Sequence, residues 1–339
     1  MKKIALIVDV DNWAFSNIAR NVVKRLSQYY EFTIIPSDYV EDNLVKIWLM
    51  VKDYDLVHFL WRGHLIYHIF DNFDKYIQSI GGNSKIFKKK YIFSKNFSTD
   101  VYDHLFLDED GMKNITEKVF DVCRNYYVSS KKLLDIYNVL PLKHKPWGEI
   151  TDGVDLEKFY PQKLDRFKNI KNRKIVIGWV GNSKWQDNEV DFKGVNTILK
   201  PVINELIDEG YPVEMYFADR NERMISHDEM VDYYAKIDLY ICTSQIEGTP
   251  NPVLESMACG VPIISTNVGI VPEALGKLQS KYILKERSKE CLKKKIIELI
   301  KNPEKFEQLS NENLESIKPW SWDNKVQDFK RFFDYCLKK

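Results

Sequence analysis

Residues 238–273 read DLYICTSQIEGTPNPVLESMACGVPIISTNVGIVPE, and this stretch decides the fold that the sequence predicts. Its apolar run 239–242 is short enough to be a buried parallel strand. Asn251 and Pro252 then predict the N-cap and first residue of a helix, because Asn can accept a free backbone N–H and Pro has none to donate. A second strand is predicted at 261–264. Strand, helix and strand form one βαβ unit, and such units bind ligands beyond the carboxyl ends of their strands.

Two carboxylates follow the first of these strands, Glu247 in the loop and Glu255 in the first helical turn. A carboxylate can accept hydrogen bonds from sugar hydroxyls, and the backbone N–H groups at 252–254 can face an anion. Hydroxyl acceptors beside an anion site suit a nucleotide-sugar. Two solvated glutamates beside an ordinary helix are an equally good interpretation of the residues alone.

The residues Glu247-Gly-Thr-Pro-Asn-Pro-Val-Leu-Glu255 also resemble the Glu-x7-Glu signature of the retaining family-4 glycosyltransferases. The resemblance implies the GT-B architecture, in which two Rossmann-like, doubly wound α/β domains face each other across a cleft. It implies a nucleotide-sugar as the donor substrate. It further implies that the reaction uses no cofactor and no dedicated metal.

The chain has 339 residues and carries 50 Lys and Arg against 49 Asp and Glu, so its net charge is +1. This balance argues against nucleic acid as a partner. The length predicts two domains. The resemblance assigns the acceptor to residues 1–155, with a crossover helix at 322–339, and the nucleotide-sugar to residues 156–321. No signal peptide and no cysteine pairing are evident, which predicts a cytoplasmic location.

Short apolar runs at 4–8, 32–35, 56–60 and 91–93 alternate with helical spacings in the first domain. Such alternation predicts a parallel, doubly wound sheet.

Polar side chains that follow the predicted strands of the first domain are candidates for the acceptor side. Asp9 and Asp11 follow the first strand, and they either form a metal-binding pair or cap the next helix. No third ligand is apparent, so no metal site is predicted. The acceptor-side candidates are Asp11, Trp13, Arg62 and His64.

The resemblance also implies a catalytically important histidine in the loop after a strand such as 91–93. The loop 94–100 contains no histidine, and the nearest one is His104. His104 is therefore the candidate for this role.

A basic run with interleaved apolar residues lies at 85–90, with cations at Lys85, Lys88, Lys89 and Lys90. Most such runs form a solvated edge. The alternative is peripheral contact with the anionic inner face of a membrane.

Residues 175–180 predict the first strand of the second domain, which Gly181 and Asn182 close. Lys193 lies at the N-terminus of the next predicted helix, where the dipole, free N–H groups and the ammonium all favour an anion. The resemblance implies that an Arg at the glycine loop and a Lys at this helix bind the diphosphate. Lys193 matches the Lys. Asn182 stands in place of the Arg, and Lys184 is its candidate substitute.

The sequence is therefore interpreted as a retaining glycosyltransferase of surface polysaccharide or glycoconjugate biosynthesis, with a glycan or lipid-linked acceptor. The candidate catalytic residues are Lys193, Glu247 and His104. The candidate nucleotide-sugar contacts are Gly181, Asn182, Lys184, Arg220, Ile225, Thr249, Pro250, Asn251, Val253, Leu254 and Glu255. The alternatives are a glycoside phosphorylase or nucleotide-sugar epimerase of the same architecture, and a two-domain sugar-binding protein without activity.

Overall fold

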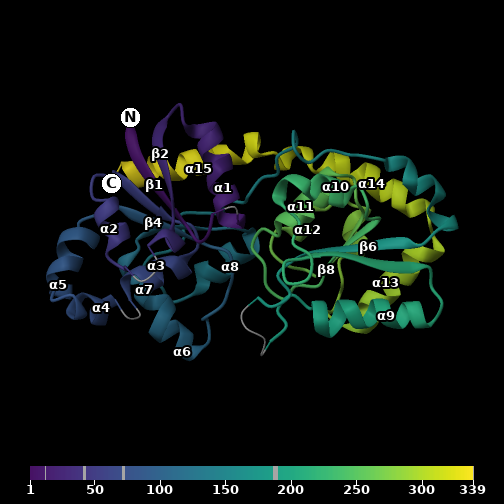
Figure 1. Ribbon diagram of the computed structural model, residues 1–339, viewed down its shortest axis with the longest axis horizontal. Coiled ribbons are helices and arrows are strands. Elements are labelled where there is room, and N and C mark those ends of the chain that lie inside the picture. Colours follow the sequence, from purple (N-terminus) through teal and green to yellow (C-terminus); the bar gives the residue numbers. More distant parts are fainter. Residues whose placement is uncertain (12, 41–42, 71–72, 186–189, 339) are drawn as a thin grey trace. The chain divides into compact units, whose positions relative to one another are not determined.

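The computed structural model describes residues 1–338 except 12, 41–42, 71–72 and 186–189. The chain forms two compact units: unit 1 contains residues 1–152 and 325–339, and unit 2 contains residues 153–324. Each unit consists of helices packed around a sheet (Figure 1). Among the described residues, no helix is both long and apolar enough to cross a membrane.

Unit 1 is built on a five-stranded parallel sheet with the strand order β2-β1-β3-β4-β5. The strands are β1 (Lys2–Val8), β2 (Tyr30–Pro36), β3 (Leu56–Phe59), β4 (Phe97–Val101) and β5 (Asn125–Val128). The helices and helical turns are α1 (Ala14–Leu26), η1 (Ser37–Tyr39), α2 (Lys46–Met50), α3 (Arg62–Ile69), α4 (Phe73–Ser79), α5 (Ser84–Phe87), η2 (Lys88–Ile92), α6 (Glu109–Gly111), η3 (Met112–Thr116), α7 (Glu117–Val122) and α8 (Lys131–Val139). The strand order reverses between β1 and β3, and sheets of this kind bind ligands beyond the carboxyl ends of the strands at such a reversal.

The fourth strand of unit 1 does not lie where the sequence predicts it. The apolar run 91–93 is not a strand, because the π-helical turn η2 runs into it, and β4 occupies Phe97–Val101 instead. The loop after this strand therefore begins at residue 102 and contains His104.

Strand β4 has a polar centre, and this hides it from a search for apolar runs. Residues 98–100 are Ser, Thr and Asp, and all three are fully buried. Tertiary contacts make this burial possible, since buried polar groups need hydrogen-bond partners. Ser98 Oγ lies 2.9 Å from His58 Nδ1, and the Tyr127 hydroxyl donates to Asp100 at 3.1 Å.

Helix α15 (Trp322–Leu337) covers one face of the unit 1 sheet (Figure 1). The ring centroids of Phe332 and Phe333 lie 5.9 Å and 5.7 Å from that of His58, and Phe332 is 5.1 Å from Tyr127. The opposite face of the sheet is packed by α2, α3, α7 and α8 around the fully buried Trp48. The chain thus returns from unit 2 to complete the core of unit 1.

Unit 2 contains a four-stranded parallel sheet with the order β7-β6-β8-β9. The strands are β6 (Ile175–Gly181), β7 (Val213–Asp219), β8 (Leu239–Cys242) and β9 (Ile263–Ser265). The helices and helical turns are η4 (Leu164–Asn172), η5 (Val195–Leu199), α9 (Lys200–Asp208), η6 (His227–Glu229), α10 (Met230–Tyr234), α11 (Asn251–Ala258), α12 (Val271–Ala274), η7 (Gln279–Tyr282), α13 (Lys289–Lys301), α14 (Glu304–Ser316) and η8 (Lys318–Trp320). Helices α9 and α13 pack on one face of the sheet and α10, α11 and α12 on the other (Figure 1). The order reverses between β6 and β8, so the loops after these two strands form the edge where a ligand is expected.

The βαβ unit predicted from residues 238–273 is present as β8, α11 and β9, but the start of its helix differs from the prediction. Helix α11 begins at Asn251 with Pro250 as its N-cap, and no side chain caps it. Pro252 has no N–H, and the Val253 N–H donates to Pro250 O at 2.9 Å. The prediction of free backbone N–H groups at 252–254 is therefore wrong for residues 252 and 253.

Candidate active site

The loops after β6 and β8 bring Lys193 and Glu247 together. Lys193 Nζ lies 2.6 Å from Glu247 Oε1, and the two side chains are 21% and 18% exposed. The ammonium also lies over the Trp185 ring, 5.1 Å from its centroid, where the negative face of the ring attracts it. Two residues predicted to be catalytic thus meet where the strand order of unit 2 reverses.

The backbone beside Lys193 is held in one position. Gly194 has a φ of +70°, and a Cβ at this residue would lie 2.7 Å from Thr243 O. The Thr243 hydroxyl donates to Lys193 O at 2.8 Å. Arg287 Nε in turn donates to Thr243 O at 2.8 Å. Arg287 is separated from the Lys193 loop by three strands in sequence, and nothing in the sequence pattern singles it out.

The N–H groups at the start of the helix after Lys193 are not free, contrary to the prediction. Asp191 Oδ1 accepts from Gly194 N at 2.7 Å, and Asp191 Oδ2 accepts from the N–H groups of Asn196 and Thr197, both at 2.8 Å. A carboxylate thus already occupies the positive end of this helix. The positive charge offered to a ligand here is the Lys193 ammonium.

The loop that carries Glu247 is fixed by a close backbone approach. A Cβ on Gly269, which has a φ of +46°, would lie 1.8 Å from Gly248 O. The Ile270 N–H donates to the same oxygen at 3.0 Å. Only glycine can occupy position 269 without displacing this loop.

Glu255 lies on α11 between the Tyr234 hydroxyl, which hydrogen-bonds to it, and the His227 ring. Its Oε2 accepts from the Tyr234 hydroxyl at 2.7 Å, and its Oε1 is 3.6 Å from His227 Nε2. Burial, followed by the charge of Glu255, raises the pKa of Tyr234 far above its usual value, so the hydroxyl stays a donor. Lys158 Nζ lies 2.7 Å from His227 Nδ1. Because an ammonium only donates, Nδ1 accepts and Nε2 carries the proton that faces Glu255.

His227 and Lys158 were not identified from the sequence. His227 begins a short turn after an exposed loop, and Lys158 lies about seventy residues earlier in a charged segment. Only the folded chain shows that they support Glu255.

Further predicted contacts lie at the carboxyl ends of β6 and β7. Asn182 Oδ1 accepts from Lys184 N at 2.9 Å and from Asn221 Nδ2 at 2.8 Å, so its amide orders the turn. Gly181 O accepts from Arg220 N at 2.9 Å. The side chains of Lys184 and Arg220 are exposed. Lys184 is therefore placed to approach a ligand on this edge.

The remaining predicted contacts divide between the core and the edge. Val253 and Leu254 are fully buried on the apolar face of α11, so their side chains are not available to a ligand. Thr249 and Pro250 are buried in the loop before the helix, and Ile225 is half-buried. Asn251 Oδ1 is buried and has no hydrogen-bond partner in the part of the chain that the structure describes.

In unit 1, Asp9 and His64 lie at the reversal between β1 and β3. Asp9 Oδ1 and His64 Nδ1 are buried, and neither has a hydrogen-bond partner within the described ranges. Burial raises the pKa of Asp9 and lowers that of His64, and the attraction between the two groups opposes both shifts. Their unused capacity for hydrogen bonds marks this edge as a candidate contact for a polar ligand.

Arg62 is a core residue, and its predicted place on the acceptor side is wrong. Its side chain is 1% exposed, and Nη2 lies 2.5 Å from Asp103 Oδ1 and 3.0 Å from Leu105 O. Trp61 Nε1 donates to Asp103 Oδ2 at 3.0 Å. The guanidinium is occupied in ordering the loop after β4.

His104 lies within this loop and is half-buried. Burial and the positive charge of Lys132 lower the pKa of His104. The ring is therefore neutral near pH 7 and can accept a proton or a hydrogen bond.

Asp11 and Trp13 lie at the start of α1. Asp11 accepts from Ser16 Oγ at 3.0 Å and forms an ion pair with Arg20, so these bonds join it to side chains of α1, whose N-cap has no side-chain capping hydrogen bond in the described part of the chain. Trp13 is half-buried at the N-cap position. Among the residues that the structure describes, no group of three or more His, Cys, Asp or Glu is placed to hold a metal ion.

The predicted basic run does not form one patch. Lys88 Nζ is paired with Asp74 at 2.8 Å and lies over the Phe73 ring, so this side chain is turned inward. Lys85, Lys89 and Lys90 are exposed.

Residues 223–315 include Glu247, Glu255 and the βαβ unit between β8 and β9. This segment matches the family model of the group 1 glycosyl transferases. The matched segment thus contains the acidic half of the site, and Lys193 precedes it in the chain.

The chain is also similar to a glycosyltransferase of Methanocaldococcus jannaschii described as uncharacterized. The two are 27% identical over 207 residues, which cover 53% of this chain and 58% of the relative. The match thus spans little more than half the length of that curated relative.

Two solved structures show the same fold at low identity. A sucrose-phosphate synthase from Thermosynechococcus elongatus has a TM-score of 0.66 at 15% identity and covers 100% of both chains. Anabaena HepE, solved in complex with UDP and glucose, has a TM-score of 0.68 at 11% identity and covers 98% of this chain and 100% of its own. The prediction of an α/β fold with two parallel Rossmann-like sheets of the GT-B type is confirmed.

Proposed function

We propose that the protein is a retaining glycosyltransferase that transfers a sugar from a nucleotide-diphosphate sugar to a glycan or lipid-linked acceptor. The observation that carries this proposal is the Lys193–Glu247 ion pair at the strand-order reversal of unit 2. It offers a cation for a diphosphate and a carboxylate for sugar hydroxyls within 2.6 Å of each other. The match of residues 223–315 to the group 1 family supports it.

The donor is assigned to unit 2. Lys193 stabilises the negative charge that develops on the diphosphate as the anomeric C–O bond breaks, which is the charge that a preorganised cation stabilises best. Glu247 accepts from the sugar hydroxyls, and Glu255 accepts from the ribose. The UDP and glucose bound by Anabaena HepE are consistent with this class of donor.

The acceptor is assigned to unit 1, with His104 as the candidate for receiving its hydroxyl proton. The lowered pKa of His104 keeps the ring neutral, as a proton acceptor must be. No protein nucleophile is assigned, and the acceptor is proposed to attack from the face that the leaving group departs. A cytoplasmic location is part of this proposal. For a lipid-linked acceptor, the exposed Lys85, Lys89 and Lys90 would contact an anionic membrane surface.

The test is a transfer assay with a panel of UDP-, GDP- and ADP-sugars and glycan acceptors. We expect acceptor-dependent release of nucleoside diphosphate and a product whose anomeric configuration, read by NMR, equals that of the donor. Inversion at the anomeric carbon would contradict the retaining assignment. Phosphate-dependent turnover would identify a phosphorylase. Conversion of the donor without an acceptor would identify an epimerase, and binding of a sugar without turnover would identify a sugar-binding protein.

A Glu255→Gln variant is expected to bind nucleoside diphosphate about 1.5–3 kcal/mol more weakly, because a charge-assisted hydrogen bond to the ribose becomes a neutral one. Isothermal titration calorimetry measures this loss. Tyr234→Phe is the matched control, since it removes only the hydroxyl that orients Glu255, and we expect a smaller loss there. Unchanged binding by Glu255→Gln would remove this residue from the site.

A further inference from the structure

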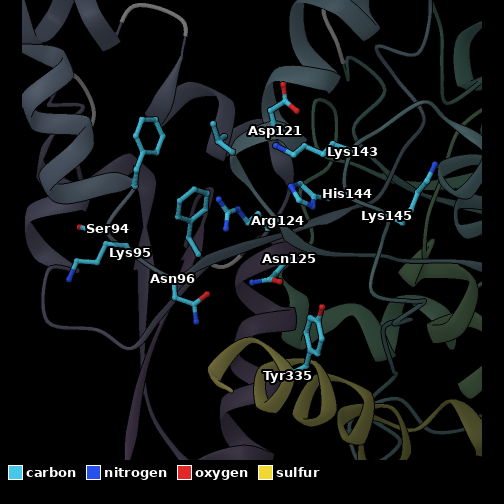
Figure 2. Close-up of a pocket in the computed structure, with 13 residues that line it drawn as sticks. Ser94, Lys95, Asn96, Asp121, Arg124, Asn125, Lys143, His144, Lys145 and Tyr335 are labelled. Atoms are coloured by element: carbon cyan, nitrogen blue, oxygen red, sulfur yellow. The ribbon is translucent and has the colours of Figure 1, made fainter. Parts of the chain in front are cut away.

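Unit 1 contains a pocket at the edge of its sheet opposite to the strand ends that carry its candidate residues. The pocket has a volume of about 960 Å³ and lies at the amino ends of β4 and β5, beside α15 (Figure 2). The candidate residues of unit 1 follow the carboxyl ends of the strands instead. The lining residues are Phe93, Ser94, Lys95, Asn96, Phe97, Asp121, Val122, Arg124, Asn125, Lys143, His144, Lys145 and Tyr335.

The charge of this lining is predominantly positive. Four of its residues are Lys or Arg, and Asp121 is its single carboxylate. Lys95 and Lys145 donate to the backbone carbonyls of Lys52 and Asn138. Arg124 and Lys143 are exposed, and no acceptor is recorded for either in the part of the chain that the structure describes. Two unengaged cations on one pocket wall favour an anionic ligand.

A buried amide in the pocket requires a hydrogen-bond donor. Asn125 is 7% exposed, and its Oδ1 is buried without a hydrogen-bond partner among the described residues. Buried polar atoms in folded proteins are nearly always hydrogen-bonded. An anionic oxygen cannot satisfy Oδ1, because both atoms are acceptors, whereas a ligand hydroxyl can.

Two of the aromatic rings in the lining are exposed. Phe93 is 52% exposed and Tyr335 is 36% exposed. The Tyr335 ring stands on α15 and points towards Asn125 in the view of Figure 2. An exposed aromatic face beside hydrogen-bonding groups can pack against the apolar face of a sugar ring.

We propose that this pocket binds a polyhydroxylated anion, that is, a sugar ring that bears a phosphate or a carboxylate. Arg124 and Lys143 bind the charged group, Asn125 Oδ1 accepts from a ring hydroxyl, and Tyr335 packs against the ring. The site shares no residue with the proposed donor site, because all of its residues belong to unit 1. A phosphorylated metabolite and an acidic residue of a glycan share this chemistry.

Calorimetric titration with four probes tests the proposal. Glucose 6-phosphate represents a sugar phosphate and glucuronic acid the acidic residue of a glycan, whereas inorganic phosphate lacks the ring and glucose lacks the charge. We expect at least one of the first two to bind tenfold or more tightly than phosphate and glucose, and which of them does so identifies the source. Binding of phosphate as tight as that of both sugar anions, or no binding of either sugar anion, would overturn the proposal.

Substitutions test whether the sugar anion binds in this pocket. We expect Arg124→Gln/Lys143→Gln to weaken sugar-anion binding at least tenfold. The charge-matched control Lys75→Gln/Lys113→Gln, at two exposed lysines of unit 1 outside the pocket, should change it less than twofold. Asn125→Leu should bring the affinity for the sugar anion close to that for phosphate. Equal effects of the two double variants, or loss of binding in Lys193→Ala, would place the ligand elsewhere and overturn the proposal.

Discussion

A Lys193→Ala variant is expected to lose about a hundredfold or more in kcat, a barrier increase of roughly 3 kcal/mol, with a smaller rise in donor KM. The Lys193 ammonium is mostly buried beside Glu247 and Trp185, so water screens its charge only partly. Its attraction for the diphosphate grows as the bond to the sugar breaks, which favours the transition state over the bound donor. Steady-state kinetics with the best donor of the panel measures both constants.

Two comparison variants separate this effect from its alternatives. Lys184→Ala removes an exposed cation on the same edge, and we expect a smaller loss of kcat there. Lys193→Ala also leaves the Glu247 carboxylate without its partner, where it would repel a diphosphate. The effect of Lys193→Ala is therefore also measured against Glu247→Gln, in which that repulsion is absent, and we expect Lys193→Ala/Glu247→Gln to have a clearly lower kcat than Glu247→Gln. A near-normal kcat for Lys193→Ala would mean that the leaving group is neutralised by another residue.

An Asp103→Asn variant is expected to lose about 3–5 kcal/mol of the free energy of unfolding, because it leaves the buried Arg62 guanidinium without a counter-charge. Denaturant unfolding measures the loss. Asp328→Asn is the surface control in the same unit. It removes the partner of the largely exposed Arg331, and we expect a change below about 1 kcal/mol. Arg62→Met/Asp103→Leu, which removes both charges, should be more stable than Asp103→Asn.

The same pair makes stability depend on pH. Burial opposes the ionisation of Asp103, but the Arg62 charge and the hydrogen bonds from Arg62, Trp61 and Leu105 together outweigh it and hold the pKa of Asp103 below its usual value. Its contribution is therefore complete above the unfolded pKa of about 4 and is lost as the pH falls through the lower folded pKa. The difference in stability between the wild type and Asp103→Asn should shrink over that acidic range. A difference that is constant with pH would show that the carboxylate charge is not what stabilises Arg62.

Local sequence patterns predict the strands and helices of this fold that are buried through apolar side chains. The strands at 239–242 and 263–265 are apolar runs, and the helix between them has an apolar face. The bounds predicted for this βαβ unit therefore lie within a few residues of those in the structure. Strand β4 was missed because residues 98–100 are polar and are buried only through partners on other strands.

The residues of the candidate site also fall into those that a local sequence pattern identifies and those that it does not. Lys193 and Glu247 were identified from a motif within their own loops, whereas Asp191, Arg287 and His227 act through contacts that only the folded chain creates. Arg62 was misplaced for a related reason. A charged residue after a strand suggests an exposed position, and its buried partner Asp103 lies about forty residues away in the sequence.

Helix α15 packs on unit 1 but follows unit 2 in the chain, so unit 1 cannot be completed before unit 2 has been synthesised. Residues 325–339 belong to unit 1 but follow the whole of unit 2 in the chain. The ribosome therefore releases the unit 1 sheet long before Phe332 and Phe333 exist to cover the face at His58 and Tyr127. Unit 1 therefore exposes this apolar surface to chaperones throughout the synthesis of unit 2.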